Sequence, residues 1–234
     1  MKRNNRNRRT KLNKERSLIT HYDPKSVISE QYRTIRTNIQ YSLIDEELKT
    51  LMVTSAGPGE GKSTTISNLA VVMAQQGNHV ILVDADLRKP TVHHTFRSTN
   101  TRGLTNVLTR QSDIDEVIAK TEIERLSILP SGPIPPNPSE LLSSKMMGRT
   151  VQYLSEQFDI VLFDCPPILA VTDAQILANY CQGVILVVKS RATEIEAAQK
   201  AKEQLQHVNA KLLGVVLNDR EMNGGTYYYY YYGE

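Results

Sequence analysis

A glycine-rich stretch at residues 56–64 constrains the fold of this chain more than any other feature. Its sequence is Ala-Gly-Pro-Gly-Glu-Gly-Lys-Ser-Thr, it follows an apolar run at residues 51–54, and apolar residues at helical spacing come after it. A phosphate-binding loop requires this order of strand, glycine loop and helix, because glycines let successive backbone amides turn toward an anion and the helix N-terminus adds partial positive charge. The stretch therefore predicts a site for a nucleoside triphosphate.

Each type of residue in this stretch has an expected part. Lys62 supplies a mobile cation for the phosphates, and the Ser63 hydroxyl can ligate Mg²⁺. Phosphate-binding loops usually begin with glycine, and this chain has Ala56 at that position. Gly57 and Gly59 can supply the backbone flexibility that the replacement of glycine by alanine removes. The residues expected to bind the nucleotide are Gly57, Gly59, Glu60, Gly61, Lys62, Ser63 and Thr64.

The length of 234 residues suits one α/β domain with an arm at each end. We expect a basic, flexible arm at residues 1–22, the domain at residues 23–222, and a flexible tail at residues 223–234. No apolar run approaches the ~18 residues that span a bilayer, and no signal-peptide pattern is seen near the N-terminus. Cys165 and Cys181 lack metal-ligand or redox spacing, so we expect reduced thiols and a cytoplasmic protein.

The net charge of +3 conceals an uneven distribution. Residues 1–16 hold eight Lys or Arg and one Glu, which gives +7 and leaves −4 for the rest of the chain. Such an arm can attract nucleic acid or an anionic membrane, and it can also be a solvated leader without a partner. We expect a contact with an anionic membrane and no binding of nucleic acid.

Acidic residues end two further apolar runs. Asp84 and Asp86 follow the run at residues 79–83, with Arg88 close behind, and Asp164 follows the run at residues 160–163. Buried parallel strands deliver such carboxylates to the carboxyl edge of a sheet. In a phosphate-loop protein this edge is where metal-binding carboxylates are expected.

The rest of the chain alternates strands with helices. Apolar runs at residues 126–129, 184–188 and 212–217 predict strands, Thr172 with Gln175 predicts a helix start, and residues 193–208 predict a helix. Together with the first motif, this alternation predicts a phosphate-loop NTPase fold: a mostly parallel sheet with helices on both faces. Asn218 follows the last strand, where it could contact the nucleotide base or simply form a turn.

An amphipathic helix is expected from the Asp23-Pro24 pair to about Leu43. Ile28, Tyr32, Ile35, Ile39 and Leu43 fall on one narrow stripe of this helix. Beside the stripe lies a charged row that cannot easily face the chain's own core. It is either a surface for another subunit or a solvated face with an internal ion pair. The charged row consists of Glu30, Arg33 and Arg36.

Six consecutive tyrosines, Tyr227–Tyr232, nearly end the chain. Core packing cannot explain the run, and an uncharged aromatic run is an aggregation hazard. Since the chain also carries the motifs of a phosphate-transfer site, the function that best accounts for the tyrosine run is to accept phosphate.

Five motifs together resemble the bacterial tyrosine kinases of capsular and exopolysaccharide loci, in the form whose kinase is a separate chain from its membrane activator. They are residues 56–64 as phosphate loop, 83–88 as second acidic motif, 163–167 as third acidic motif, 30–36 as oligomerisation motif and 227–232 as autophosphorylated tail. The division-site ATPases of the wider superfamily carry an extra lysine where this chain has Gly57, which argues against them.

The resemblance implies an ATP- and Mg²⁺-dependent protein-tyrosine autokinase. It implies that Lys62, Asp84 and Asp86 are catalytic, with Asp84 as acceptor of the phenol proton, and that Asp86 and Asp164 hold Mg²⁺ together with Ser63. It also places Arg88 near the phosphates. Tyr227, Tyr228, Tyr229, Tyr230, Tyr231 and Tyr232 would be the phosphorylated residues.

The same resemblance implies a ring-shaped homo-oligomer with transfer between subunits, a transmembrane activator that recruits the kinase to the inner face of the membrane, and a cognate tyrosine phosphatase. Its role would be to regulate polysaccharide synthesis and export. Two other classes of function remain open from the sequence. One is a nucleotide-gated ATPase switch, and the other is a structural ring subunit of an export assembly without kinase activity.

Overall fold

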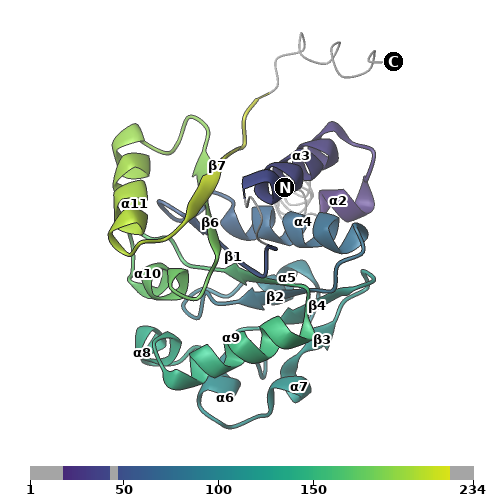
Figure 1. Ribbon diagram of the computed structural model, residues 1–234, viewed down its shortest axis with the longest axis vertical. Coiled ribbons are helices and arrows are strands. Elements are labelled where there is room, and N and C mark those ends of the chain that lie inside the picture. Colours follow the sequence, from purple (N-terminus) through teal and green to yellow (C-terminus); the bar gives the residue numbers. More distant parts are fainter. Residues whose placement is uncertain (1–17, 43–46, 222–234) are drawn as a thin grey trace, which may run out of the picture.

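Seven strands form one sheet in the order β3-β4-β2-β5-β1-β6-β7 in the computed structural model, which describes residues 18–42 and 47–221 (Figure 1). All neighbouring strands pair in parallel except β3 and β4, which are antiparallel. The predicted mostly parallel sheet is confirmed, and the two-residue strand β3 is an addition to it. The strands are β1 (Thr50–Ser55), β2 (Val80–Asp84), β3 (Ala119–Lys120), β4 (Leu126–Leu129), β5 (Ile160–Asp164), β6 (Gly183–Lys189) and β7 (Leu212–Asn218).

Helices cover both faces of the sheet, as predicted (Figure 1). The first four pack on one face, and the others, including a long helix α9 that no sequence motif marks, pack on the opposite face. The helices are α2 (Ile19–Tyr22), α3 (Val27–Ser42), α4 (Lys62–Gln75), α5 (Val92–Thr95), α6 (Leu104–Leu108), α7 (Ile114–Val117), α8 (Pro138–Leu142), α9 (Lys145–Gln157), α10 (Asp173–Ala178) and α11 (Ile195–His207). No helix in the described ranges is both long and apolar enough to cross a bilayer.

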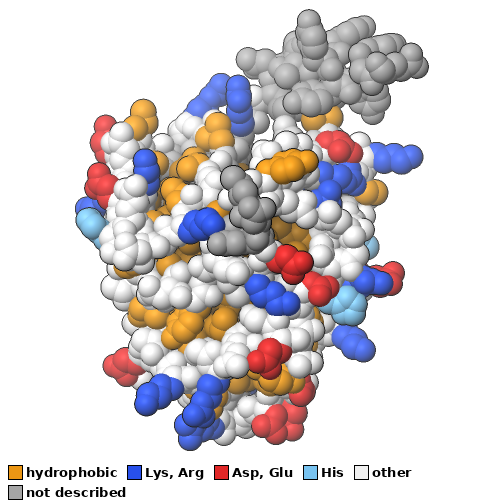
Figure 2. Space-filling model, in the orientation of Figure 1, with side chains coloured by type: hydrophobic (Ala, Val, Ile, Leu, Met, Phe, Trp, Pro, Cys, Tyr) orange, Lys and Arg blue, Asp and Glu red, His pale blue; other side chains and the backbone are white. Residues whose placement is uncertain are grey.

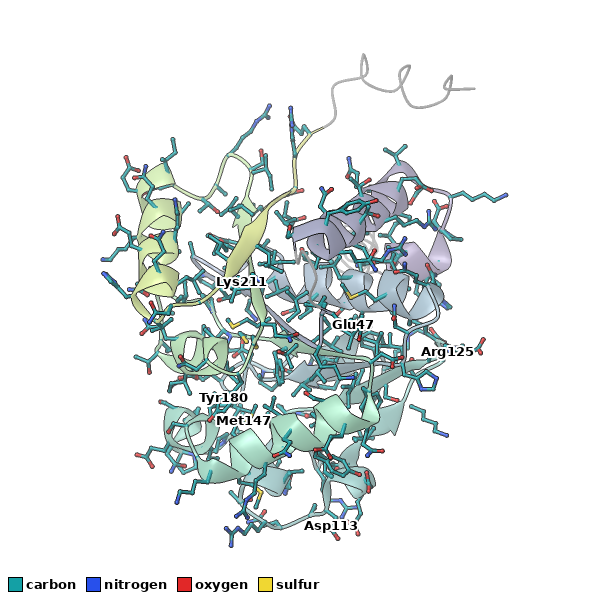
Figure 3. The ribbon with its side chains drawn as sticks, viewed as in Figure 1. Glu47, Asp113, Arg125, Met147, Tyr180 and Lys211 are labelled. Atoms are coloured by element: carbon teal, nitrogen blue, oxygen red, sulfur yellow. The ribbon has the colours of Figure 1, made fainter. Side chains whose placement is uncertain are left out.

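The central strands are buried on both sides, which is why their sequences are continuous apolar runs. Along β1, Leu51 belongs to the core beneath α4, whereas Met52 belongs to the core of the opposite face. On that second face Met147 of α9 is fully buried, and Tyr180, just after α10, packs against the same core (Figure 3). The sheet thus separates two apolar cores and fixes the positions of its strand ends.

Helix α3 begins at Val27, so the expected start at Pro24 is wrong. The Ser29 backbone amide donates to the Ser26 hydroxyl at 3.2 Å, which makes Ser26 the capping residue. The hydroxyls of Ser26 and Ser29 both donate to the Asp23 carbonyl, at 2.9 and 2.7 Å. These bonds hold residues 23–26 in a turn, and the helix can begin only after it.

The apolar stripe of α3 is confirmed only in part. Tyr32 and Ile39 are buried against α4, but Ile28 is 51% exposed. Ser29 is buried in place of Ile28 because its hydroxyl bonds to the turn before the helix. Leu43, expected at the end of the stripe, lies outside the described residues.

The folded part of the chain begins earlier than the expected boundary at residue 23. Leu18 is buried, and the Thr20 hydroxyl donates to the Asn68 side-chain oxygen of α4 at 2.8 Å. Residues 18–22 are therefore packed on the domain and are not part of a flexible arm. Residues 1–17 and the tail at residues 222–234 lie outside the described ranges.

A glycine substitution tests the packing at the start of α6. A Cβ atom added to Gly103 would lie 2.1 Å from the Pro130 carbonyl oxygen and 2.4 Å from the Gly132 amide nitrogen, both backbone atoms. We expect Gly103→Ala to lower the free energy of unfolding by about 1–3 kcal/mol or more, through overpacking. Gly214→Ala is the matched control, because nothing lies within 4 Å of its added Cβ. Urea denaturation of both variants measures the effect, and equal stabilities would contradict the packing described.

Candidate active site

The carboxyl ends of β1, β5 and β2 bring three of the sequence motifs to one edge of the sheet. The three strands are parallel neighbours, with Val53 of β1 opposite Asp164 of β5 and Asp164 opposite Asp84 of β2. The phosphate loop follows β1, and the segment that carries Asp86 follows β2. The motifs therefore meet where ligands bind to open parallel sheets.

The phosphate loop depends on two glycines with left-handed backbone. Gly59 has φ 76° and Gly61 has φ 96°, and Gly61 directly precedes the first residue of α4. A Cβ atom on Gly61 would also lie 2.0 Å from the side-chain nitrogen of Asn218, which donates to the Glu60 carbonyl oxygen at 2.9 Å. The predicted order of strand, loop and helix is confirmed, and the end of β7 packs directly on this loop.

Glu60 faces the protein. Its carboxylate accepts a hydrogen bond from the Ala56 amide at 3.1 Å and another from the Thr193 hydroxyl at 2.8 Å, and the residue is buried. The carboxylate is therefore engaged within the protein, and any contact of Glu60 with a nucleotide would have to come from its backbone amide. Ala56 is not among the residues with positive φ, so this position does not require glycine. Thr193 carried no sequence signal, because a lone threonine before a helix resembles any helix start.

Lys62, the first residue of α4, lies between two acids. Its ammonium nitrogen is 2.9 Å from Asp86 Oδ2, 3.3 Å from Asp164 Oδ1 and 3.3 Å from the Ser63 hydroxyl. Burial disfavours the charged ammonium, but Asp164 and Asp86 together raise the pKa of Lys62 above its ordinary value. Lys62 is therefore a fixed cation that links all three motifs.

Asp84 is completely buried at the end of β2. Its Oδ2 accepts hydrogen bonds from the amides of Thr91 and Val92, at 2.9 and 3.0 Å, and its Oδ1 has no hydrogen-bond partner in the part of the chain that the structure describes. Burial and the neighbouring charge of Asp164 raise the pKa of Asp84 to about 8. This carboxyl group is a much stronger base than an ordinary aspartate.

Asp164 and Asp86 complete the acidic cluster. Asp164 is fully buried, burial raises its pKa although Lys62 opposes this, and its Oδ2 has no hydrogen-bond partner among the described residues. Asp86 Oδ1 accepts from the Lys89 amide at 3.0 Å.

The cluster suits Mg²⁺, which binds to proteins through one or two carboxylates and completes its shell with phosphates and water. The unpartnered oxygens belong to Asp84 and Asp164, which end neighbouring strands at the edge where the phosphate loop follows β1. Within residues 18–42 and 47–221 no three His, Cys, Asp or Glu side chains form a ready-made metal cage. A cation here would therefore need the phosphates of a nucleotide as further ligands.

Arg88 pairs with an acid that sequence reasoning missed. Its Nε and Nη2 donate to the two carboxylate oxygens of Asp173, at 2.8 and 3.0 Å, and Asp173 is fully buried. Only the helix start marked by Thr172 and Gln175 was predicted at this place, and α10 does begin at Asp173. An acid in the first helical turn is so common that its sequence position alone could not reveal the pairing.

The charged row of α3 is bound to its own subunit more than expected. Arg33 forms an ion pair with Glu30 and also donates to the Pro24 carbonyl at 2.8 Å. Arg36 Nη1 donates to the Val72 carbonyl of α4 at 2.9 Å, so the expectation that the row turns away from its own core is wrong for Arg36. The cause is the closeness of α3 to α4, which brings Arg36 within reach of that carbonyl.

Comparisons with known proteins agree with this geometry. The AAA domain family matches residues 48–216. The tyrosine-protein kinase YwqD of Bacillus subtilis is 53% identical over 209 residues, which cover 89% of this chain and 88% of YwqD. The putative tyrosine-protein kinase CapB of Staphylococcus aureus is 40% identical over 217 residues, covering 93% of this chain and 95% of CapB.

Solved structures point the same way. The crystal structure of the chimerical protein CapA2B2 superimposes with a TM-score of 0.85 at 43% identity, covering 88% of this chain and 90% of that one. The chain belongs to the bacterial tyrosine kinases, protein-tyrosine kinases with the fold of a phosphate-loop NTPase.

Proposed function

We propose that this kinase transfers the γ-phosphate of ATP to its own C-terminal tyrosines, Tyr227–Tyr232. The observation that carries the proposal is the position of Lys62, held by Asp86 and Asp164 next to Ser63 at the start of α4. The family relationship supports tyrosine as the acceptor. The tyrosine run itself lies outside the described residues, and its use rests on the sequence.

The phosphate loop and the neighbouring acids would have different roles in the transfer. Backbone amides of the phosphate loop and the Lys62 ammonium would bind the β- and γ-phosphates, and Ser63, Asp86 and Asp164 would hold Mg²⁺. Bound Mg²⁺ would neutralise charge on the phosphates. The tyrosine oxygen would bond to the γ-phosphorus as the bond to the leaving ADP oxygen breaks, and Asp84 would take the phenol proton.

The raised pKa of Asp84 supports this last assignment. A value of about 8 lies nearer to the ~10 of a phenol than an ordinary aspartate does, so the proton transfer is less unfavourable. Asn218 remains a proposed contact of the nucleotide base, supported by its place against Gly61.

We place the transfer between subunits of a ring. β7 ends at the same sheet edge as β1, and Tyr227 lies nine residues after Asn218, at most ~30 Å of extended chain. That length lets a tail reach its own site or a neighbour's. The charged row supports a head-to-tail contact that would close into a ring, because the Glu30 side chain is 63% exposed and that of Arg33 is 29% exposed.

Partners of this assembly follow from the family and from the surface. Hydrophobic side chains are exposed near β7 and α3, including Val215 and Ile28, and Figure 2 shows such side chains gathered on the part of this face where β7 lies. They support docking of a transmembrane activator that recruits the kinase to the inner membrane face. The basic residues 1–16 would add a contact with anionic lipid, and a tyrosine phosphatase would reverse the modification. The process controlled would be polysaccharide synthesis and export.

Removal of the phosphate-binding groups tests the site. We expect Ser63→Ala and Lys62→Met each to reduce autophosphorylation by about 10²–10³-fold or more, because each removes a group that meets charge in the transition state. Lys62→Met also leaves two buried carboxylates without their cation, so it should unfold at a lower temperature, whereas Ser63→Ala should not. Anti-phosphotyrosine detection and thermal unfolding measure both effects. Phosphorylation that persists in Lys62→Met would contradict the assignment and favour another site.

Asp84→Asn tests the raised pKa and the proposed base. The folded pKa of about 8 lies above the ordinary value of 3.8, so the contribution of Asp84 to stability is present below pH 3.8 and is lost as pH rises toward 8. Between about pH 5 and pH 8 the wild type should therefore lose stability relative to Asp84→Asn, measured as Tm without nucleotide or Mg²⁺. Transfer should fall by about 10²–10⁴-fold, with a smaller change in ATP affinity. A difference in Tm that is constant over this pH range would refute the raised pKa.

Mixed oligomers test the direction of transfer. A Lys62→Met chain, which has a tail but no active site, is mixed with an active chain that ends at residue 222. Transfer between subunits predicts phosphotyrosine on the Lys62→Met chain. Its absence in mixtures shown to contain both chains in one oligomer would exclude transfer between subunits.

A further inference from the structure

We infer that Asp173 is a positioning residue for phosphate transfer, which acts through Arg88 to fix the segment carrying Asp86 to the segment that follows Asp164. The inference rests on the proposed function for its reaction. It also changes the expected part of Arg88, which the family resemblance implies to lie near the phosphates.

The pair has the geometry of a structural clamp. Arg88 presents Nε and Nη2 to both oxygens of Asp173, at 2.8 and 3.0 Å, in the two-pronged arrangement that fixes orientation as well as distance. The Asp173 side chain is fully buried, whereas that of Arg88 is 38% exposed. Arg88 Nη2 also lies 3.4 Å from the Ser139 hydroxyl in the first turn of α8. With Nε and Nη2 engaged in this way, the fork of Arg88 faces Asp173 and α8.

On one side of the clamp lies Asp86. β2 ends at Asp84, so no strand pairing fixes Asp86. Two hydrogen bonds hold its carboxylate, one from the Lys89 amide at 3.0 Å and one from Lys62 Nζ at 2.9 Å. Arg88 stands between Asp86 and Lys89 in the chain, so its pairing with Asp173 restrains the same short segment from outside the site.

On the other side lies the segment between β5 and α10, which is bound to β1. The Cys165 amide donates to the Val53 carbonyl at 3.1 Å, and the Ile168 amide donates to the Ser55 carbonyl at 2.9 Å. The Thr54 hydroxyl donates to the Pro166 carbonyl at 2.7 Å. Asp173 thus ends a segment built on the strand that leads into the phosphate loop.

The clamp supplies a second connection between Asp86 and the phosphate loop, independent of Lys62. Phosphates of a bound nucleotide compete with Asp86 for the same ammonium group. When Lys62 turns to the phosphates, Asp86 keeps the Lys89 amide and the Arg88–Asp173 pair. Displacements of about 1 Å at a reacting centre can cost on the order of 10²-fold in rate, so this remaining restraint matters most during the reaction.

Kinetics of the full-length kinase test the inference, with Asp173→Asn, Arg88→Lys and the double variant. We expect each single variant to lower the rate of autophosphorylation at saturating ATP by about tenfold or more, and to raise the Mg²⁺ concentration needed for half-maximal rate. The concentration of ATP for half-maximal rate should change by less than about threefold. The double variant should be no slower than the slower single variant, because both changes break one interaction. Calorimetric measurement of ATP binding, with and without Mg²⁺, compares the ATP and Mg²⁺ requirements of the variants with those of the wild type without turnover.

Glu116→Gln is the matched control. It breaks the surface ion pair between Glu116 and Arg102, which are 53% and 57% exposed, and its kinetics should equal those of the wild type. Thermal unfolding of every variant accompanies the kinetics. Because Asp173 is buried and Arg88 is partly exposed, Arg88→Lys keeps the test valid if Asp173→Asn folds poorly.

Three results would overturn the inference. One is a wild-type rate in Asp173→Asn or in a well-folded Arg88→Lys. Another is a loss of rate that only follows the loss of folded protein. The third is a rise in the ATP requirement in Arg88→Lys alone with additive effects in the double variant, which would place Arg88 on the phosphates. A wild-type chain that forms no phosphotyrosine would instead refute the proposed function, and the Mg²⁺-dependent binding measurements would still decide the role of the pair.

Discussion

The contact of Lys62 with Asp86 and Asp164 is the interaction on which the arrangement of the site depends. The Lys62 ammonium nitrogen lies 2.9 Å from Asp86 Oδ2 and 3.3 Å from Asp164 Oδ1, and all three side chains have little access to water. None of these charged groups could be buried in this way alone. The lysine belongs to α4, one acid to the segment after β2 and the other to β5. One cation therefore holds three separate parts of the chain together.

The parallel sheet makes this contact possible. Strands β2, β5 and β1 are neighbours that run in one direction, so their carboxyl ends meet at one edge although residues 84 and 164 are far apart in the chain. Two apolar cores, one on each face, hold the strands rigidly in register. Rigidity allows buried acids with unpartnered oxygens, such as Asp84, to persist at a cost in stability that a bound cation would offset.

Contacts outside the motifs connect the site to the rest of the molecule. Glu60 binds the phosphate loop to Thr193 before α11, and Asn218 at the end of β7 contacts the same loop. The last strand before the tyrosine tail thus lies directly on the nucleotide-binding loop. Arg36 joins α3 to the carbonyl of Val72 in α4, the helix that begins with Lys62. The element proposed to contact a neighbouring subunit is therefore packed on the element that begins with Lys62, the proposed catalytic lysine.

The sequence by itself determined every strand except β3, the phosphate loop and the acids that end two strands. These features depend on local patterns: continuous apolar runs, glycines before a helix, and charge at a strand end. It also determined the family, through motifs that stand in a fixed order. Only the tertiary structure decided that Glu60 faces inward, that Ser26 and not Asp23 caps α3, and that Arg36 binds its own subunit. Asp173 could not be found from the sequence either, since its partner Arg88 is 85 residues away and its own position resembles any helix start. Such pairings depend on which elements the sheet places side by side, and no local pattern in the chain records that.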